Sequence, residues 1–172
     1  MSAAHQSLIY IFRGGDELPR QVLLGEKLRG FGRGNVMGPG GHREDGETDR
    51  EAAIRELGEE TGVIAAAADV EQVATLTFRF PADPTSDAIV SVFTAATWTG
   101  TVRASDELAP QWYDVDAIPL DRMWDDDRYW LPRILAGERL TAEFSYDDAG
   151  TRVVSHRITP THPTDPAPPI SP

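Results

Sequence analysis

The 172-residue chain contains no cysteine. This absence excludes disulfide bonds, thiolate metal sites and a cysteine nucleophile, and it agrees with a reducing cytoplasm. The chain also has no long apolar run. Its start, MSAAHQSLIYIFRGG, lacks a basic segment, and its apolar stretch is too short for a signal peptide or a membrane span. We therefore expect a cytoplasmic protein that does not act in a membrane.

Positive charge is scarce: the chain has 16 Lys and Arg residues but 28 Asp and Glu residues, which gives a formal net charge of −12. Proteins hold nucleic-acid polymers through cationic patches, so we do not expect such a polymer as a partner. A small anionic ligand can still bind where metal ions and a few local cations offset the negative charge.

Length and composition are those of one globular domain, and the pattern of residues mixes strands with helices. Helices are expected within 48–62 and within 127–137, where Pro132 should kink the second helix or mark its start. The six prolines from Pro160 onward predict a disordered tail over 160–172 and a single domain over 1–159. Strands are expected at 8–12, 22–24, 70–80, 88–98 and 111–115, and as a hairpin of 141–146 with 151–158.

The first expected helix carries clear end signals. Thr48 and Glu51 have the spacing of a capping box, and Gly62 is a natural C-terminal stop. Residues three and four apart are neighbours on a helix, so Ile54, Leu57 and Thr61 form a stripe that should face the core. Arg55 should pair with one of the acidic residues before it, Glu47 or Glu51.

The same helix places three glutamates, Glu56, Glu59 and Glu60, within one turn. Like charges at this spacing destabilise a helix by roughly 0.2–0.5 kcal/mol per pair, and a bound divalent cation would offset that cost. Mg²⁺ prefers such oxygen ligands and usually bridges to substrate phosphates. The preceding segment, 30–41, has six glycines, which let the backbone approach a bulky anion. The alternative is an exposed acidic helix with no metal role.

The segment resembles the Nudix box, G-x5-E-x7-R-E-U-x-E-E-x-G-U with U aliphatic, and matches its nine specified positions. These are Gly41, Glu47, Arg55, Glu56, Leu57, Glu59, Glu60, Gly62 and Val63. The resemblance implies an α/β fold, the Nudix α/β/α sandwich with a central mixed sheet, and cleavage of a nucleoside diphosphate linked to another moiety. It also implies Mg²⁺ as cofactor, with Mn²⁺ as a substitute. The implied ligands are the carbonyl of Gly40 and the carboxylates of Glu56, Glu59 and Glu60, with Arg55 completing the catalytic set.

Three further motifs, LLGEKLRGFGRG at 23–34, SDEL at 105–108 and MWDDDRYW at 123–130, narrow the resemblance. Over residues 8–144 the chain is similar to the eukaryotic MutT-homologue hydrolases, which destroy oxidised purine nucleoside triphosphates and so sanitise the nucleotide pool. Their products are a nucleoside monophosphate and pyrophosphate. The resemblance implies that Glu107 is an additional metal or catalytic carboxylate. The implied substrate-binding residues are Lys27, Phe31, Met37, Gly40, Gly41, Phe78, Trp124, Asp126 and Asp127.

In that family the match to Trp124 stacks on the purine, and the matches to Asp126 and Asp127 bind the base edge. Two neighbouring carboxyls in a partly apolar pocket cannot both ionise cheaply, so one should hold a proton. Exchange of that proton would let one pocket recognise both oxidised guanine and oxidised adenine. From the residues alone, Trp124 can equally be a core or rim aromatic, and the two aspartates a helix N-cap pair. Phe31, Phe78 and Phe80 should line or support the pocket, although each can also be plain core.

The chain departs from the family in the loop before the box. Met37 stands where the family has a base-contacting Asn, Asn35 lies two residues away, and His42 replaces a family Lys. Val36 and Pro39 replace family aromatics. A dinucleoside polyphosphate, ADP-ribose or a modified pyrimidine triphosphate is therefore an alternative substrate, and a nucleotide-sensing module without catalysis is a further alternative. The sequence favours neither a monomer nor a homodimer.

Overall fold

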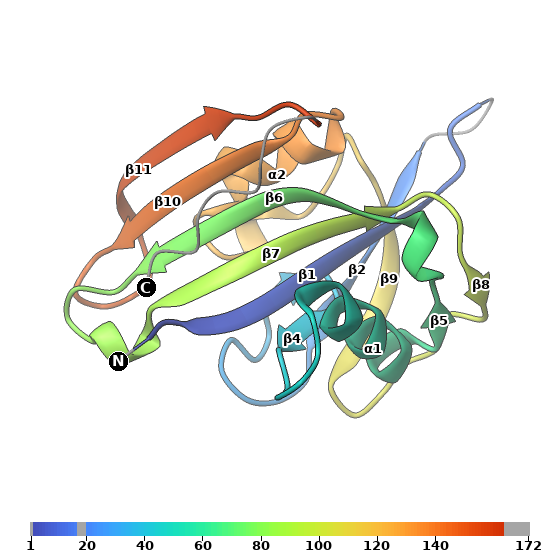
Figure 1. Ribbon diagram of the computed structural model, residues 1–172, viewed down its shortest axis with the longest axis horizontal. Coiled ribbons are helices and arrows are strands. Elements are labelled where there is room, and N and C mark those ends of the chain that lie inside the picture. Colours follow the sequence, from blue (N-terminus) through green and yellow to red (C-terminus); the bar gives the residue numbers. More distant parts are fainter. Residues whose placement is uncertain (1, 17–19, 164–172) are drawn as a thin grey trace.

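The computed structural model describes residues 2–16 and 20–163. In this part of the chain a nine-stranded mixed sheet lies between two α-helices, α1 (Asp49–Thr61) and α2 (Asp127–Leu135), one on each face (Figure 1). The expected α/β/α sandwich is thus confirmed. The strands of the large sheet are β1 (Ala4–Arg13), β2 (Gln21–Lys27), β3 (Val36–Met37), β4 (Gly40–His42), β6 (Val70–Arg79), β7 (Ala88–Ala95), β9 (Leu108–Asp114), β10 (Leu140–Tyr146) and β11 (Val153–Pro160).

The strand order is β11-β10-β6-β7-β1-β2-β3, with β4 also paired to β1 and β9 to β2. The pairs β1–β7 and β6–β10 are parallel, and the other pairs are antiparallel. A separate small sheet pairs β5 (Val63–Ile64) with β8 (Thr99–Gly100). Three short 3₁₀ helices complete the described elements, at Ala67–Asp69, Pro84–Ser86 and Leu120–Arg122.

Strand β1 lies in the middle of the sheet and separates two apolar cores, because successive side chains of a strand point to opposite faces. On one face Ile9 packs in the same cluster as Leu57 of α1. On the other face Tyr10 packs in the same cluster as Trp130 of α2. All four side chains are at most 1% exposed. The two helices are therefore held on opposite sides of the same strand.

Helix α1 begins and ends where its residues predict. The backbone N–H of Glu51 donates to Thr48 Oγ1 at 3.2 Å, and the backbone N–H of Thr48 donates to Glu51 Oε2 at 2.7 Å. Gly62 adopts φ 77°, a left-handed conformation that a glycine reaches without strain, and its N–H donates to the carbonyl of Gly58. Leu57 and Thr61 are fully buried as expected, whereas Ile54 is only partly buried.

The glycine-rich segment is not a loop throughout its length. It contains β3 and the first two residues of β4, and β4 pairs with the start of β1, with Leu8 opposite Gly40. A Cβ atom added to Gly40 would lie 1.9 Å from the backbone oxygen of Ser7. Only glycine lets the two strands approach this closely, which places the start of the Nudix-like segment beside β1.

Helix α2 begins at Asp127 and includes Pro132 in its interior, so Pro132 does not mark the start of the helix. Proline has no N–H to donate to the carbonyl four residues earlier, that of Arg128. The helix nevertheless persists because Trp130 and Leu131 are fully buried against the sheet. Within the described residues, no helix is long and apolar enough to span a membrane.

The predicted closing hairpin is confirmed by the antiparallel pair β10–β11. Pro160 pairs with Leu140 at the end of β11, and the N–H of Thr161 donates to the carbonyl of Arg139. The ordered sheet thus includes Pro160, one residue beyond the predicted boundary at 159. The rest of the predicted tail, residues 164–172, lies outside the described residues.

Candidate active site

A hydrogen bond joins β4 to α1 at the centre of the candidate site. The backbone N–H of Gly40 donates to Glu60 Oε1 at 2.8 Å. The backbones of Pro39 and Arg43 form hydrogen bonds with β1. Along an antiparallel pair, hydrogen-bonded residues alternate with residues whose backbone groups point away from the partner strand, and Gly40 is one of the latter. The N–H and C=O of Gly40 therefore both point away from β1 and toward α1. Its carbonyl oxygen lies on the same side as the Glu60 carboxylate.

Glu60 is only 8% exposed. Burial raises the pKa of Glu60 to about 7, and the negative charges of Glu56 and Glu107 act in the same direction, against the hydrogen bond from Gly40. Burial also raises the pKa of Glu56, although a hydrogen bond from Arg55 opposes it. Two poorly solvated carboxylates side by side are an environment that a bound cation would stabilise.

Arg55 organises the acidic groups around it. Its guanidinium donates to Glu47 Oε1 at 2.7 Å, to Glu56 Oε1 at 3.0 Å and to Glu59 Oε2 at 3.3 Å. It also donates to the carbonyl of His42 at 3.1 Å, which ties α1 to β4. Of the two predicted partners, Glu47 is correct and Glu51 is wrong, because the Glu51 carboxylate is bonded at the helix N-terminus.

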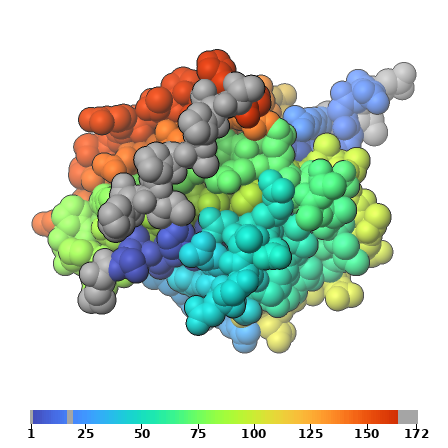
Figure 2. Space-filling view, viewed as in Figure 1, coloured from blue at the N-terminus to red at the C-terminus, as the bar shows by residue number. Residues whose placement is uncertain are grey.

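The residues fit a divalent cation by the chemistry of their donors, which are carboxylate and carbonyl oxygens. A Cβ atom added to Gly41 would lie 2.5 Å from Glu56 Oε1, so the glycine keeps space open beside that carboxylate. Glu59 is more exposed, on the surface of α1, where residues 40–61 form an outer part of the molecule (Figure 2). Among the described residues, no three acidic or histidine side chains converge into a ready-made metal site.

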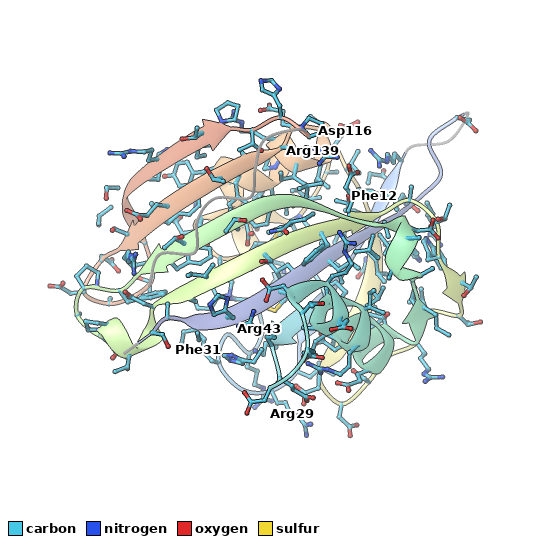
Figure 3. All side chains as sticks on the ribbon, viewed as in Figure 1. Phe12, Arg29, Phe31, Arg43, Asp116 and Arg139 are labelled. Carbon is cyan, nitrogen blue, oxygen red and sulfur yellow. The ribbon has the colours of Figure 1, made fainter. Side chains whose placement is uncertain are left out.

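Glu107 lies at the edge of this group. Its carboxylate forms an ion pair with Arg29 at 2.5 Å and is about half exposed. Its charge nevertheless raises the pKa of both Glu56 and Glu60, which shows that it is close enough to act on them. Arg29, Phe31 and Arg43 lie along the side of the molecule where β4 and α1 meet the loop after β2 (Figure 3).

A cavity of about 220 Å³ adjoins the carboxylates. All nine residues of the predicted substrate-binding set line it: Lys27, Phe31, Met37, Gly40, Gly41, Phe78, Trp124, Asp126 and Asp127. Gly40 and Gly41 are shared between the cavity wall and the carboxylate group. The cavity therefore extends from an aromatic pocket to the two glycines that lie beside Glu56 and Glu60.

Aromatic rings form much of the pocket wall. Trp124 stacks with Phe31, with ring centroids 5.2 Å apart, and Phe31 is 74% exposed. Trp124 is thus an aromatic at the rim of the cavity rather than part of the core. Phe78 stacks on Phe144 at 5.7 Å, and Phe80 stacks on Tyr146 at 5.0 Å. Phe78 and Phe80 both line the cavity and support its floor.

Asp126 and Asp127 line the cavity and are each only 5% exposed. Burial, together with the charge of Asp126, raises the pKa of Asp127 well above its ordinary value. Burial raises the pKa of Asp126 as well, although hydrogen bonds from Tyr146 and Trp130 oppose this rise. The neutral form is therefore favoured more strongly at Asp127, which lacks such side-chain hydrogen bonds, than at Asp126. Asp126 occupies the N-cap position of α2, as the N-cap alternative expected, but its side chain makes no cap hydrogen bond.

Residues 4–134 match the family model of the Nudix domain. The chain belongs to the Nudix family. It is 38% identical to the mouse oxidized purine nucleoside triphosphate hydrolase over 133 residues, which cover 77% of this chain and 83% of that protein. It is also 38% identical to the zebrafish protein of the same name over 140 residues, covering 81% of this chain and 87% of the relative.

Among solved structures, the chain resembles the MutT protein of Bacillus halodurans, with a TM-score of 0.73 and 25% sequence identity. The similarity covers 90% of this chain and 97% of that protein. Nudix hydrolases need divalent metal ions and act on small nucleotides. The oxygen-rich group on α1 and the adjoining cavity of this Nudix domain agree with both requirements.

Several residues that line the Nudix cavity were not predicted, and the aromatic ones among them are Tyr10, Trp130 and Tyr146. Trp130 lies four residues after Asp126, so helical spacing could have indicated their contact. Tyr146 lies 20 residues away on β10, and no local pattern links it to Asp126. Met37 lines the cavity, whereas Asn35 is not among the lining residues; its carbonyl accepts from the N–H of Lys27 at 2.9 Å.

Proposed function

We propose that this Nudix enzyme hydrolyses oxidised purine nucleoside triphosphates, such as 8-oxo-dGTP and 2-oxo-dATP, to nucleoside monophosphates and pyrophosphate. The names of its mouse and zebrafish relatives support this substrate class. The observation that carries the proposal is the shared position of Gly40 and Gly41. Both line the aromatic cavity, while Gly40 bonds Glu60 and Gly41 makes room for Glu56. A nucleotide in this cavity can place its base and its phosphates at opposite ends.

The proposed ion is Mg²⁺, with Mn²⁺ as a substitute. Glu56, Glu59, Glu60 and the carbonyl of Gly40 would hold it, with Glu107 nearby. When bound, the ion neutralises phosphate charge and polarises the attacking water. These donors are the hard oxygens that Mg²⁺ prefers.

In the proposed reaction a water molecule attacks a phosphorus atom of the triphosphate chain, and the phosphoanhydride P–O bond breaks. Pyrophosphate leaves with the bridging oxygen, and the water oxygen remains on the other phosphoryl group. A carboxylate of the Glu56, Glu60 and Glu107 group accepts the proton that the water loses. Arg55 orients Glu56 and Glu59 through its hydrogen bonds, and Lys27 in the cavity wall offers a positive charge to the phosphates.

At the other end of the cavity, the indole of Trp124 is the proposed stacking surface for the base. Base–aromatic stacking contributes roughly 1–3 kcal/mol per base. Phe31 already stacks on Trp124, and two stacked rings leave no room for a third between them. A purine therefore binds the free face of Trp124, or the exposed Phe31 ring moves aside. Asp126 and Asp127 then bind the edge of the base.

The test is hydrolysis of a substrate panel with Mg²⁺ and with Mn²⁺. The panel contains 8-oxo-dGTP, 2-oxo-dATP, dGTP, dATP, a modified pyrimidine triphosphate, a dinucleoside tetraphosphate and ADP-ribose, and kcat/KM is measured with identification of the products. Preference for an oxidised purine, with pyrophosphate as product, is the expected result. Preference for dinucleoside tetraphosphate or ADP-ribose would overturn the substrate class. Absence of any turnover would overturn the proposed activity.

A further inference from the structure

Both carboxylate oxygens of Asp126 accept hydrogen bonds from other side chains that line the cavity. The indole N–H of Trp130 donates to Oδ2 at 2.7 Å, and the hydroxyl of Tyr146 donates to Oδ1. An indole N–H can only donate, so Oδ2 must act as an acceptor there. Two donors on one carboxylate favour its ionised form.

The Tyr146 hydroxyl has a fixed orientation. Its oxygen accepts a hydrogen bond from the backbone N–H of Asp126 at 3.3 Å, which leaves its own proton to be donated to Asp126 Oδ1. The ring is 2% exposed and stacks on Phe80 at 5.0 Å. The pairing of β10 with β11 is irregular between Ser145 and Tyr146, and such irregularities re-aim side chains.

The neighbouring titratable groups, Asp125 and Tyr10, do not share the proton of the aspartate pair. Asp125 forms an ion pair with Arg128 and accepts a hydrogen bond from the backbone N–H of Val153 at 2.8 Å. Tyr10, on the facing strand β1, is held in its protonated form because burial and the two aspartates raise its pKa. Asp126 and Asp127 thus remain as a buried pair of carboxyls, of which only Asp126 accepts side-chain hydrogen bonds from Tyr146 and Trp130.

We propose that Tyr146 is a specificity-determining residue: by donating to Asp126 it holds the proton of the pair on Asp127. The cavity then presents one fixed acceptor, Asp126, and one fixed donor, Asp127, to the edge of a purine. The effect of this proton position on substrate choice rests on the proposed function. It differs from the sequence-based expectation that the proton exchanges between the two carboxyls.

A fixed donor and acceptor distinguish the two oxidised purines. The 8-oxoguanine edge places the O6 acceptor beside the N1–H donor, whereas the 2-oxoadenine edge carries an amino donor at position 6. The cavity pairs fully with one edge and leaves a buried polar group unpaired with the other. Such a mismatch lowers kcat/KM by about tenfold or more. Met37, whose thioether cannot donate, leaves this discrimination to the aspartate pair.

The test compares Tyr146→Phe with the matched control Tyr113→Phe, which removes a hydroxyl from a ring outside the cavity. The measured quantity is the ratio of kcat/KM for 8-oxo-dGTP and 2-oxo-dATP. We expect wild type and Tyr113→Phe to prefer one substrate by about tenfold or more, and Tyr146→Phe to bring the ratio within about threefold. The change should come mainly from improved use of the poorer substrate, which a merely destabilised variant would not show. An equal ratio in all three proteins overturns the inference.

A second measurement needs no substrate. Carboxyl ¹³C NMR of aspartate-labelled protein reports which carboxyl is protonated, with Asp127→Asn used for assignment. We expect a protonated Asp127 at neutral pH in the wild type and a proton shared between both carboxyls in Tyr146→Phe. Unchanged carboxyl signals in Tyr146→Phe overturn the placement of the proton. A changed NMR spectrum in a protein that cleaves none of the panel would instead overturn the proposed function and leave the placement of the proton in force.

Discussion

The backbone N–H of Gly40 donates to the carboxylate of Glu60 at 2.8 Å, across 20 residues of sequence. Gly40 also lines the aromatic cavity, so this hydrogen bond connects the acidic face of α1 with the pocket on the other side of β1. The acidic group of α1 and the aromatic pocket thus meet at the backbone of Gly40. The carbonyl of Gly40 faces α1, as its N–H does.

Glu60→Gln should lower kcat with Mg²⁺ by about 100-fold or more, because the amide removes a charged ligand while keeping the shape of the side chain. Mg²⁺ should raise the Tm of the wild type but raise that of the variant much less, since the ion relieves repulsion between Glu56 and Glu60. The control is Glu143→Gln, an exposed carboxylate on β10. Turnover of Glu60→Gln close to that of the control would contradict the metal assignment.

Gly41→Ala should reduce activity with little loss of folded protein. Its Cβ would lie 2.5 Å from Glu56 Oε1, so the Glu56 side chain must move away from its present position. The control is Gly58→Ala on α1, whose Cβ would lie 3.7 Å from its nearest neighbour, the carbonyl of Val63. That control should gain about 0.5–1 kcal/mol of stability, since alanine is the better helix former. Equal activity of the two variants would show that the space beside Glu56 is unimportant.

Trp124→Ala should act mainly on KM. Loss of a stacking surface that contributes roughly 1–3 kcal/mol corresponds to an increase in KM of about 5- to 150-fold for the oxidised purine, with a smaller change in kcat. Steady-state kinetics over a range of substrate concentrations separate the two parameters. An unchanged KM would remove Trp124 from the base pocket.

Asp127→Asn should stabilise the protein increasingly as pH rises. In the wild type the raised pKa keeps Asp127 protonated when folded, whereas an unfolded chain ionises it above about pH 4. Unfolding then releases a proton, so the wild type loses stability as pH rises above the ordinary Asp pKa, and the asparagine variant does not suffer this loss. The Tm difference between variant and wild type should be larger at pH 8 than at pH 5. A difference that is the same at both pH values would contradict a neutral Asp127.

Local features of the sequence were enough to predict α1 and its chemistry. The capping box at Thr48 and the stop at Gly62 depend on neighbouring residues and backbone angles, so they need no knowledge of the rest of the fold. The sequence left Glu47 and Glu51 open as partners of Arg55, and the structure shows that Arg55 bonds Glu47 while Glu51 takes part in the capping box. Resemblance to known motifs then indicated nine of the residues that line the cavity.

Only the tertiary structure decided how these parts meet. Part of the glycine-rich segment forms strands because β1 and β2 supply hydrogen-bond partners that are distant in sequence. Pro132 remains inside α2 because burial of the helix against the sheet compensates for the missing hydrogen bond. Tyr146 contacts Asp126 because β10 pairs with β6 beside the cavity, and no spacing within the sequence encodes that contact. The sequence therefore determined which chemical groups are present, and the pairing of distant strands determined which of them touch.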